Sequence, residues 1–182
     1  MIRLRALLVG VLAALAASLA ACGSDDDGGS DAATFDEEGF PFTFEYPSDL
    51  EVTSDLDFSQ SLGAAADESL AIGIEEQNAI ILQRITLNIP VTEENLDDAR
   101  AEFDSLLASV DPAASAEAGE IAGYPSLTYE DIPIPDPPEA VSDFNILFER
   151  DQEYVINCQS TPEERKTIDE ACAQALDSLQ AK

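Results

Sequence analysis

Residues 153–180, EYVINCQSTPEERKTIDEACAQALDSLQ, contain the pattern of a strand, a turn and a helix. Tyr154, Ile156 and Cys158 occupy every second position, which predicts a strand that places these three side chains on one face. The sequence TPEE at 161–164 then offers an N-cap, a proline at the first helical position and a glutamate at the third. We therefore expect a helix to begin at this point and to return over the strand.

This helix has an apolar stripe, formed by Ile168, Cys172, Ala175, Leu176 and Leu179. Cys158 points from the strand toward the same helix, so we expect Cys158 and Cys172 to form a disulfide bond if the protein is exported. An antiparallel return would carry Cys172 toward the start of the strand, so the bond requires an oblique crossing or a longer turn. A redox pair, a thiol ligand site or two small buried thiols are the alternatives, although thirteen intervening residues do not form a C-x-x-C motif.

Upstream of this stretch, GFPFTFEY at 39–46 has an aromatic side chain at every second position, which predicts a strand. Further strands are expected at 52–58, 70–74, 79–89, 119–122, 124–130 and 141–148, a loop or a short helical turn at 60–68, and a loop at 132–140. Four prolines in the second loop argue against strand pairing there. About seven strands and two long helices that do not alternate with them indicate an α+β fold with a largely antiparallel central sheet.

A second long helix is predicted after Thr92, which is an expected N-cap. Glu93 and Glu94 would lie in its first turn, where negative charge favours the helix dipole. Its apolar stripe comprises Leu96, Ala99, Phe103, Leu106, Leu107 and Val110.

The N-terminus has the pattern of a secretory signal. Arg3 and Arg5 precede fourteen uncharged residues at 6–19, fewer than the about 20 that a stable membrane span needs. The sequence LAAC at 19–22 resembles the lipobox of bacterial lipoprotein precursors. This resemblance implies cleavage before Cys22 and a diacylglyceryl group on its thiol. An ordinary signal peptide followed by a chance cysteine is the alternative.

The expected domains are a lipoprotein signal peptide at 1–21, an acidic tether at 22–37 and one globular domain at 38–182. The tether is rich in Gly, Ser and Asp and has little to bury, so it would hold the domain off the extracytoplasmic face of the cell membrane. Three consecutive aspartates at 25–27 would repel one another and stay hydrated, which argues against a metal site. With 38 acidic and 8 basic residues the chain should also repel nucleic acid.

Four blocks of the sequence resemble PsbP-like domains in type and order: FTFEYPSDLEV at 42–52, LNIPVTEENLDDARAEFDSLL at 87–107, GYPSLTYE at 123–130, and the segment 148–180. The last block is also similar to actinobacterial lipoproteins of the LpqN kind, in which a strand cysteine and a helix cysteine recur. The resemblance implies a central antiparallel sheet flanked by helices, an α/β/α sandwich. Proteins of this kind are mostly binding or assembly proteins without catalytic residues, and no binding residue is carried over from them.

Catalytic and cofactor motifs are absent from the sequence. The chain has no histidine, which excludes histidine-based triads and imidazole metal sites, and it has no phosphate-binding or dinucleotide-binding glycine motif. Two carboxylates could serve a glycosidase, but the lack of tryptophan argues against a sugar-stacking cleft. The aspartates near 55–57 and 131–136 could offer oxygen ligands to calcium, and the proline-rich loop could display a polyproline II strip. We expect no catalytic residue, no metal and no cofactor.

Two functional classes remain. The first is a lipid-anchored interaction or assembly module of the cell envelope, with an unknown envelope protein as partner. The second is a lipoprotein that binds a small molecule or a lipid in a cavity between sheet and helix. A gap lined by Phe40, Phe42, Phe44 and Phe103 and open to solvent would favour the second class, and a filled core would favour the first.

Overall fold

The computed structural model describes residues 31–54, 66–75, 77–135 and 137–182. The expected lipidation site Cys22, the aspartates at 55–57 and most of the expected loop at 60–68 lie outside the described residues. None of the helices within the described ranges has the length and apolar character needed to cross a membrane.

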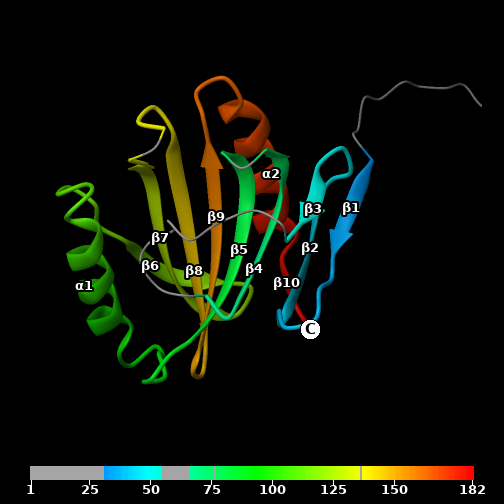
Figure 1. The fold of residues 1–182 in the computed structure, drawn as a ribbon. Helices are drawn as coiled ribbons and strands as arrows, with labels where there is room; N and C mark the ends of the chain where they lie inside the picture. Colours follow the sequence, from blue (N-terminus) through cyan, green and yellow to red (C-terminus); the bar gives the residue numbers. More distant parts are fainter. Residues whose placement is uncertain (1–30, 55–65, 76, 136) are drawn as a thin grey trace, which may run out of the picture.

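A seven-stranded antiparallel sheet forms the centre of the protein (Figure 1). Each pair of neighbouring strands is antiparallel, and β4–β5 and β8–β9 form the hairpins expected from the alternation of apolar residues. In order across the sheet the strands are β3 (Glu51–Thr53), β4 (Glu68–Glu75), β5 (Asn78–Thr86), β9 (Gln152–Ser160), β8 (Val141–Glu149), β7 (Tyr124–Pro133) and β6 (Glu117–Ile121). The α+β class with a largely antiparallel sheet is confirmed.

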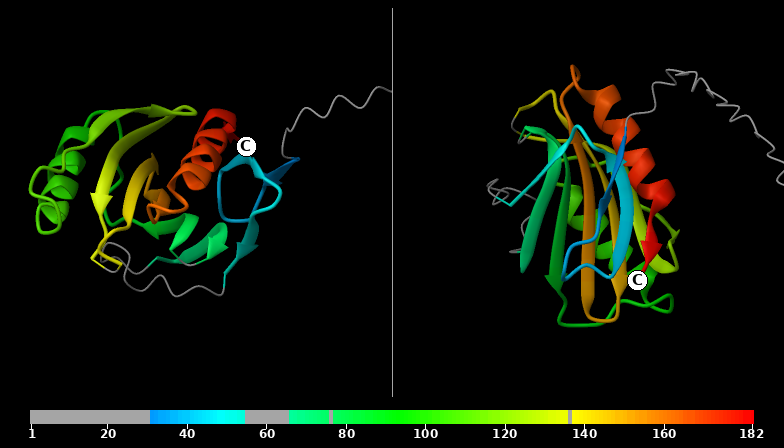
Figure 2. Two further views of the ribbon diagram at one scale, coloured as in Figure 1. Left: turned by 90° about the horizontal axis from the view of Figure 1, so that it is seen from above. Right: turned by 90° about the vertical axis from the view of Figure 1, so that its right-hand side faces the viewer.

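The two helices lie on opposite faces of this sheet. Helix α1 (Leu96–Leu107) and helix α2 (Arg165–Ser178) are separated by its strands in the view from above (Figure 2). The register explains the separation, because Tyr154 and Ile156 of β9 belong to the hydrophobic cluster under α2 whereas Val155 belongs to the cluster under α1. Both faces of β9 are therefore buried.

The aromatic segment expected at 39–46 forms a second, smaller sheet instead of joining the central one. Strand β2 (Phe42–Pro47) pairs with β1 (Ala32–Phe35) on one side and with β10 (Gln180–Ala181) on the other. Helix α2 packs against β2 as well as against β5 and β9. The small sheet and α2 together cover one face of the central sheet, with the rings of Phe40, Phe42 and Phe44 between them.

The boundary expected at residue 38 between tether and domain is wrong. Residues 32–35 form β1, and Phe35 is only 1% exposed within the cluster under α2. The composition of 22–37 predicts a solvated segment. However, the burial of the Phe35 ring in a large hydrophobic cluster stabilises residues 32–35 as part of the folded domain.

Both helices begin later than their capping patterns predict. Helix α2 begins at Arg165 after a turn at 161–164, and Thr161 does not cap it. Instead, the backbone N–H of Thr161 donates to Oδ1 of Asn78, 2.8 Å away, which ties the turn to the β4–β5 hairpin. Helix α1 likewise begins at Leu96, and the backbone N–H of Thr92 donates to Oδ1 of Asn95.

Cys158 and Cys172 are joined by a disulfide bond, with Cα atoms 6.1 Å apart. The late start of α2 provides the longer turn that this geometry requires. Cys172 lies seven residues into α2, a rise of roughly 10 Å, and so reaches the end of β9 and not its beginning.

We expect the exported protein to contain no free thiol at Cys158 or Cys172. Ellman's reagent in denaturant measures this directly, and prior treatment with a reductant should expose two thiols as the positive control. Two free thiols in protein taken from the cell envelope without reduction would contradict the pairing.

The proline-rich segment is part strand. Ile132 pairs with Ser142 and Pro133 with Val141 after a register shift in β7, so a loop over the whole of 132–140 is wrong. Asp131 has a φ of 56° at this irregularity, and its backbone N–H donates to Oδ1 of Asp143. A proline is tolerated here because the last pair of a strand does not need its N–H.

Candidate functional site

The space between α1 and the central sheet contains a cleft. It has a volume of about 550 Å³ and is partly open to solvent. Strands β5, β9 and β8 form its floor, α1 forms its roof, and the segment that leads from β5 to α1 closes one side. This size falls within the range of about 300–1,000 Å³ that is common for small-molecule sites.

The cleft exists because α1 is held at its ends and covers only part of the sheet. It packs most closely against β6 and β7, at the side of the sheet away from β5. Leu107, the last residue of α1, is 1% exposed, while Leu106 is 58% exposed. Of the apolar stripe expected for this helix, only Leu107 is fully buried.

Polar contacts fix both ends of this arrangement. Oδ1 of Asp104 accepts hydrogen bonds from the Tyr129 hydroxyl, 2.8 Å away, and from the backbone N–H of Ala116. Burial and this hydrogen bond raise the pKa of Tyr129, so the phenol remains a donor. Before the helix, the backbone N–H groups of Leu87 and Val91 donate to carbonyl groups in the β8–β9 turn.

Most of the cleft lining is apolar. Its apolar residues are Ile85, Leu87, Ile89, Val91, Ala99, Phe103, Leu106, Ile146, Phe148 and Val155. The rings of Phe103 on α1 and Phe148 on β8 lie with their centroids 6.3 Å apart and connect roof and floor. Such a lining favours apolar ligands, since water inside it gains few hydrogen bonds.

Glu153 is the exception on the cleft floor. Its side chain lines the cleft, the residue is 5% exposed, and its carboxylate forms no hydrogen bond or ion pair with any described residue. Burial raises the pKa of Glu153 to about 7, with a further contribution from the negative charge of Glu102 on α1. The group can therefore carry or release a proton near neutral pH.

The other polar lining residues are acidic or neutral. Asp98 and Glu102 are exposed and line the cleft from α1, and Gln83, Asn88 and Asn95 complete the polar set. None of the described residues that line the cleft is basic. The electrostatic potential of the cleft is therefore negative, and it attracts cations more than anions.

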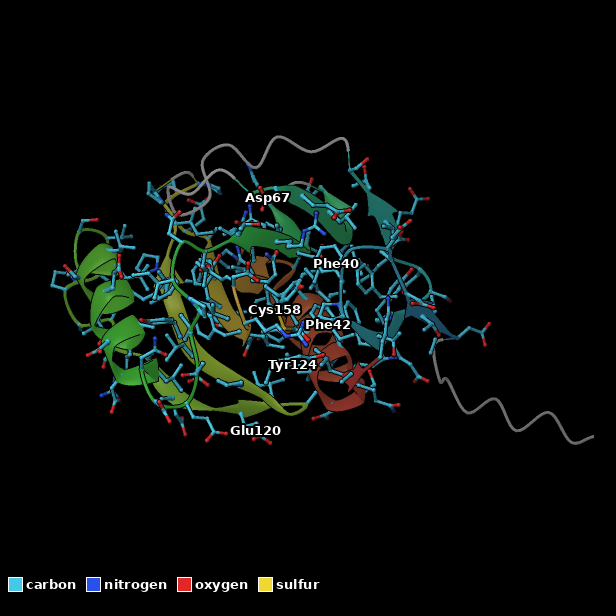
Figure 3. All side chains as sticks on the ribbon, turned by 90° about the horizontal axis from the view of Figure 1, so that it is seen from below. Phe40, Phe42, Asp67, Glu120, Tyr124 and Cys158 are labelled. Carbon is cyan, nitrogen blue, oxygen red and sulfur yellow. A yellow bond between two sulfur atoms is a disulfide. The ribbon has the colours of Figure 1, made fainter. Side chains whose placement is uncertain are left out.

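The aromatic residues expected around a single gap do not meet. Phe40, Phe42 and Phe44 are at most 3% exposed and fill the core on the α2 side, whereas Phe103 lines the cleft on the α1 side. Figure 3 shows Phe40, Phe42 and Tyr124 near α2 and well away from α1. The gap expected between these rings is absent from the described part of the chain, and a different gap takes its place.

In the oxygen-rich segment expected near 131–136, Asp131 pairs with Arg165 at the start of α2, and Arg165 also pairs with Asp169. Asp136 lies outside the described residues. Within the described ranges there is no group of three or more acidic, cysteine or histidine residues that could hold a metal ion.

The cleft and Glu153 were not predicted from the sequence. The alternation in EYVINC identifies Tyr154, Ile156 and Cys158 as one face of β9, and Glu153 then reads as part of a solvated face. The available signal was the neighbouring Val155, together with Phe144, Ile146 and Phe148 on the paired face of β8. These side chains indicate that the second face is also covered.

Comparison with solved structures identifies the fold. Cyanobacterial PsbP (CyanoP) from Synechocystis sp. PCC 6803 is 16% identical to this chain, with a TM-score of 0.55. The match covers 90% of this chain and 99% of CyanoP. The fold of this chain is PsbP-like.

The PsbP-like fold expected from the order of the sequence blocks is thus confirmed. A crystal structure from Bacteroides thetaiotaomicron VPI-5482 is also similar, at 10% identity and a TM-score of 0.48, over 82% of this chain and 48% of that one. No protein-family model and no curated protein sequence matches the chain.

Proposed function

We propose that this protein is a lipid-anchored binding protein on the extracytoplasmic face of the cell membrane, without a catalytic role, and that its PsbP-like domain binds a small apolar molecule. The lipobox-like LAAC at 19–22 supports the anchor, and the acidic segment after it supports a spacer between membrane and domain. The absence of histidine and of catalytic motifs from the sequence supports the non-catalytic role.

The observation that carries the binding role is the cleft beneath α1. A partly open cleft of about 550 Å³ with a mostly apolar lining and a few polar groups is the usual form of a small-molecule site. The filled core around Phe40, Phe42 and Phe44 on the α2 side favours the interaction module, and the cleft on the opposite face of the sheet is the observation that favours the binding role.

A substitution on α1 that fills the cleft tests the binding role. Ala99 lines the cleft from α1, whereas Ala101 is exposed on the same helix and does not line it. In the mature chain with Cys22→Ser, which lacks the proposed lipid, we expect Nile red to bind with increased fluorescence. Ala99→Phe should abolish this binding because the ring fills the cleft, and Ala101→Phe should preserve it. Circular dichroism checks that both variants fold.

Absence of Nile red binding in the unsubstituted chain, or an equal loss in both variants, would contradict a binding role for the cleft.

An interaction or assembly module is the second candidate. It is favoured by Ile89 and Leu106, which are 72% and 58% exposed at the edge of the cleft. A pull-down of the anchored protein with envelope proteins, identified by mass spectrometry, tests it.

We expect the mature protein to begin at Cys22 and to carry a diacylglyceryl group. The intact mass should equal that of residues 22–182 plus this adduct. Cys22→Ala should release the protein into the medium or leave it as unprocessed precursor, because the variant lacks the Cys22 thiol to which the lipid would be attached. A mature N-terminus at any other residue would overturn the proposed anchor.

A further inference from the structure

We propose that the cleft beneath α1 selects apolar molecules that carry one protonated amine, and that the carboxylate of Glu153 is the counter-ion of that amine. The inference rests on the proposed function, because it names the chemistry of the ligand in the same cleft. It is carried by the position of one buried carboxylate and by the charges around it.

The carboxylate of Glu153 has no partner among the described residues and opens on the cleft. On the cleft floor it lies opposite Ile85 of β5 and Phe148 of β8 in the strand register. The residue is 5% exposed and its carboxylate has no hydrogen bond or ion pair among the described residues. Its oxygens are not among the fully buried side-chain atoms without a partner, which are Ser142 Oγ and Asn157 Oδ1 in the described part of the chain, so they still reach the cleft. The carboxylate is largely desolvated there, and an ammonium group in the cleft would restore a strong partner through a charge-assisted hydrogen bond.

The surrounding charges favour a cation over an anion. Asp98 and Glu102 face the cleft from α1, and the lining residues of β5, β8 and the segment 87–91 are uncharged. Arg100 of α1 is paired with Asp97, 3.0 Å away, and does not line the cleft. Arg150 is exposed in the β8–β9 turn and does not line it either. A carboxylate or phosphate ligand would therefore meet only negative charge inside.

The lining favours a mostly apolar body for the rest of the ligand. Phe103, Phe148 and Ile146 line the same cleft as Glu153, and their side chains offer no hydrogen bond to a sugar or a peptide backbone. Ile89 and Leu106 extend the apolar surface out to solvent. A single amine on an alkyl chain or an aromatic ring matches this distribution, with the amine at the floor and the apolar part toward α1.

Three ligands of equal chain length test the proposal: decylamine, decanol and decanoate. Each displaces Nile red from the mature chain with Cys22→Ser, first near pH 8 and then near pH 6. We expect decylamine to bind at least about tenfold more tightly than decanol near pH 8, the difference that one charge-assisted hydrogen bond provides. Decanoate should be the weakest of the three. The preference for the amine should decrease toward pH 6, as Glu153 gains a proton.

Glu153→Gln should reduce the preference for decylamine over decanol to within about twofold, because glutamine has nearly the same shape as glutamate without the charge. The preference is a ratio of two affinities measured on the same variant, so a change in Nile red affinity does not affect it. Glu120→Gln is the matched control, because Glu120 is exposed on β6, outside the cleft (Figure 3). The amine assignment would be overturned if decanol bound as tightly as decylamine or more tightly, or if the preference for decylamine increased as the pH falls. It would also be overturned if Glu153→Gln kept the preference for decylamine. These results differ from a failure of the proposed function, in which Nile red itself does not bind or is insensitive to Ala99→Phe.

Discussion

Phe35→Ala is expected to lower the free energy of unfolding by about 3–5 kcal/mol, the usual cost of removing a fully buried phenylalanine. Phe35 is 1% exposed, its ring stacks on Phe44 with centroids 4.6 Å apart, and it meets the edge of Phe40 at 5.4 Å. Urea denaturation of the mature chain with Cys22→Ser, followed by circular dichroism, measures the change.

Thr34→Ala is the matched control for this experiment, since Thr34 is exposed on the same strand and its loss should change stability by no more than about 0.5 kcal/mol. If Phe35→Ala had as small an effect as Thr34→Ala, residues 32–35 would belong to the tether after all. The pair therefore locates the N-terminal boundary of the folded domain.

Glu153→Gln is expected to stabilise the protein by about 3 kcal/mol near pH 8 and to have little effect near pH 4.5. The pKa of this carboxyl rises from 4.5 to about 7 on folding, chiefly through burial. The folded state therefore keeps a proton that the unfolded chain releases between these two values, and stability falls as the pH rises through this window. Above about pH 7 the whole penalty is present, at about 1.4 kcal/mol for each pKa unit. Glutamine does not titrate and avoids it.

Denaturation of the wild-type and variant chains at both pH values gives this difference directly. Glu120→Gln, at an exposed position on β6, should show no comparable gain near pH 8. A stability difference for Glu153→Gln that is equal at the two pH values would contradict the buried, unpartnered carboxyl. A residue that lowers stability near neutral pH, in the floor of an open cleft, is typical of a group kept for binding.

The local pattern of the sequence was sufficient for most of the secondary structure and for part of the pairing. Alternation around Tyr154 and Ile156 defines the buried face of β9, and the short polar interruptions at 75–78 and 150–152 define two hairpins. The disulfide between Cys158 and Cys172 was also predictable, because strand period and helix period each place one thiol on the facing surfaces. These features depend on residues close together in the chain.

Contacts between distant residues decided what the local pattern could not. Thr161 has the sequence of an N-cap, but Asn78, 83 residues away, takes its backbone N–H, and α2 begins later. The aromatic strand β2 reads as a member of the central sheet, yet it pairs with the first and last described strands of the chain in a sheet of its own. The alternation of apolar residues predicts which side chains of a strand share a face, but it does not predict which other strand pairs with that strand.

The candidate site belongs entirely to the tertiary structure. The sequence by itself determined an acidic chain without histidine, with a lipobox-like Cys22, an α+β fold and a pair of cysteines that can bond. Only the tertiary structure decided that α1 rests on β6 and β7 and leaves β5, β9 and β8 partly uncovered. The buried state of Glu153 follows from that placement, because a carboxylate at the start of a strand is solvated or desolvated by whatever packs above it.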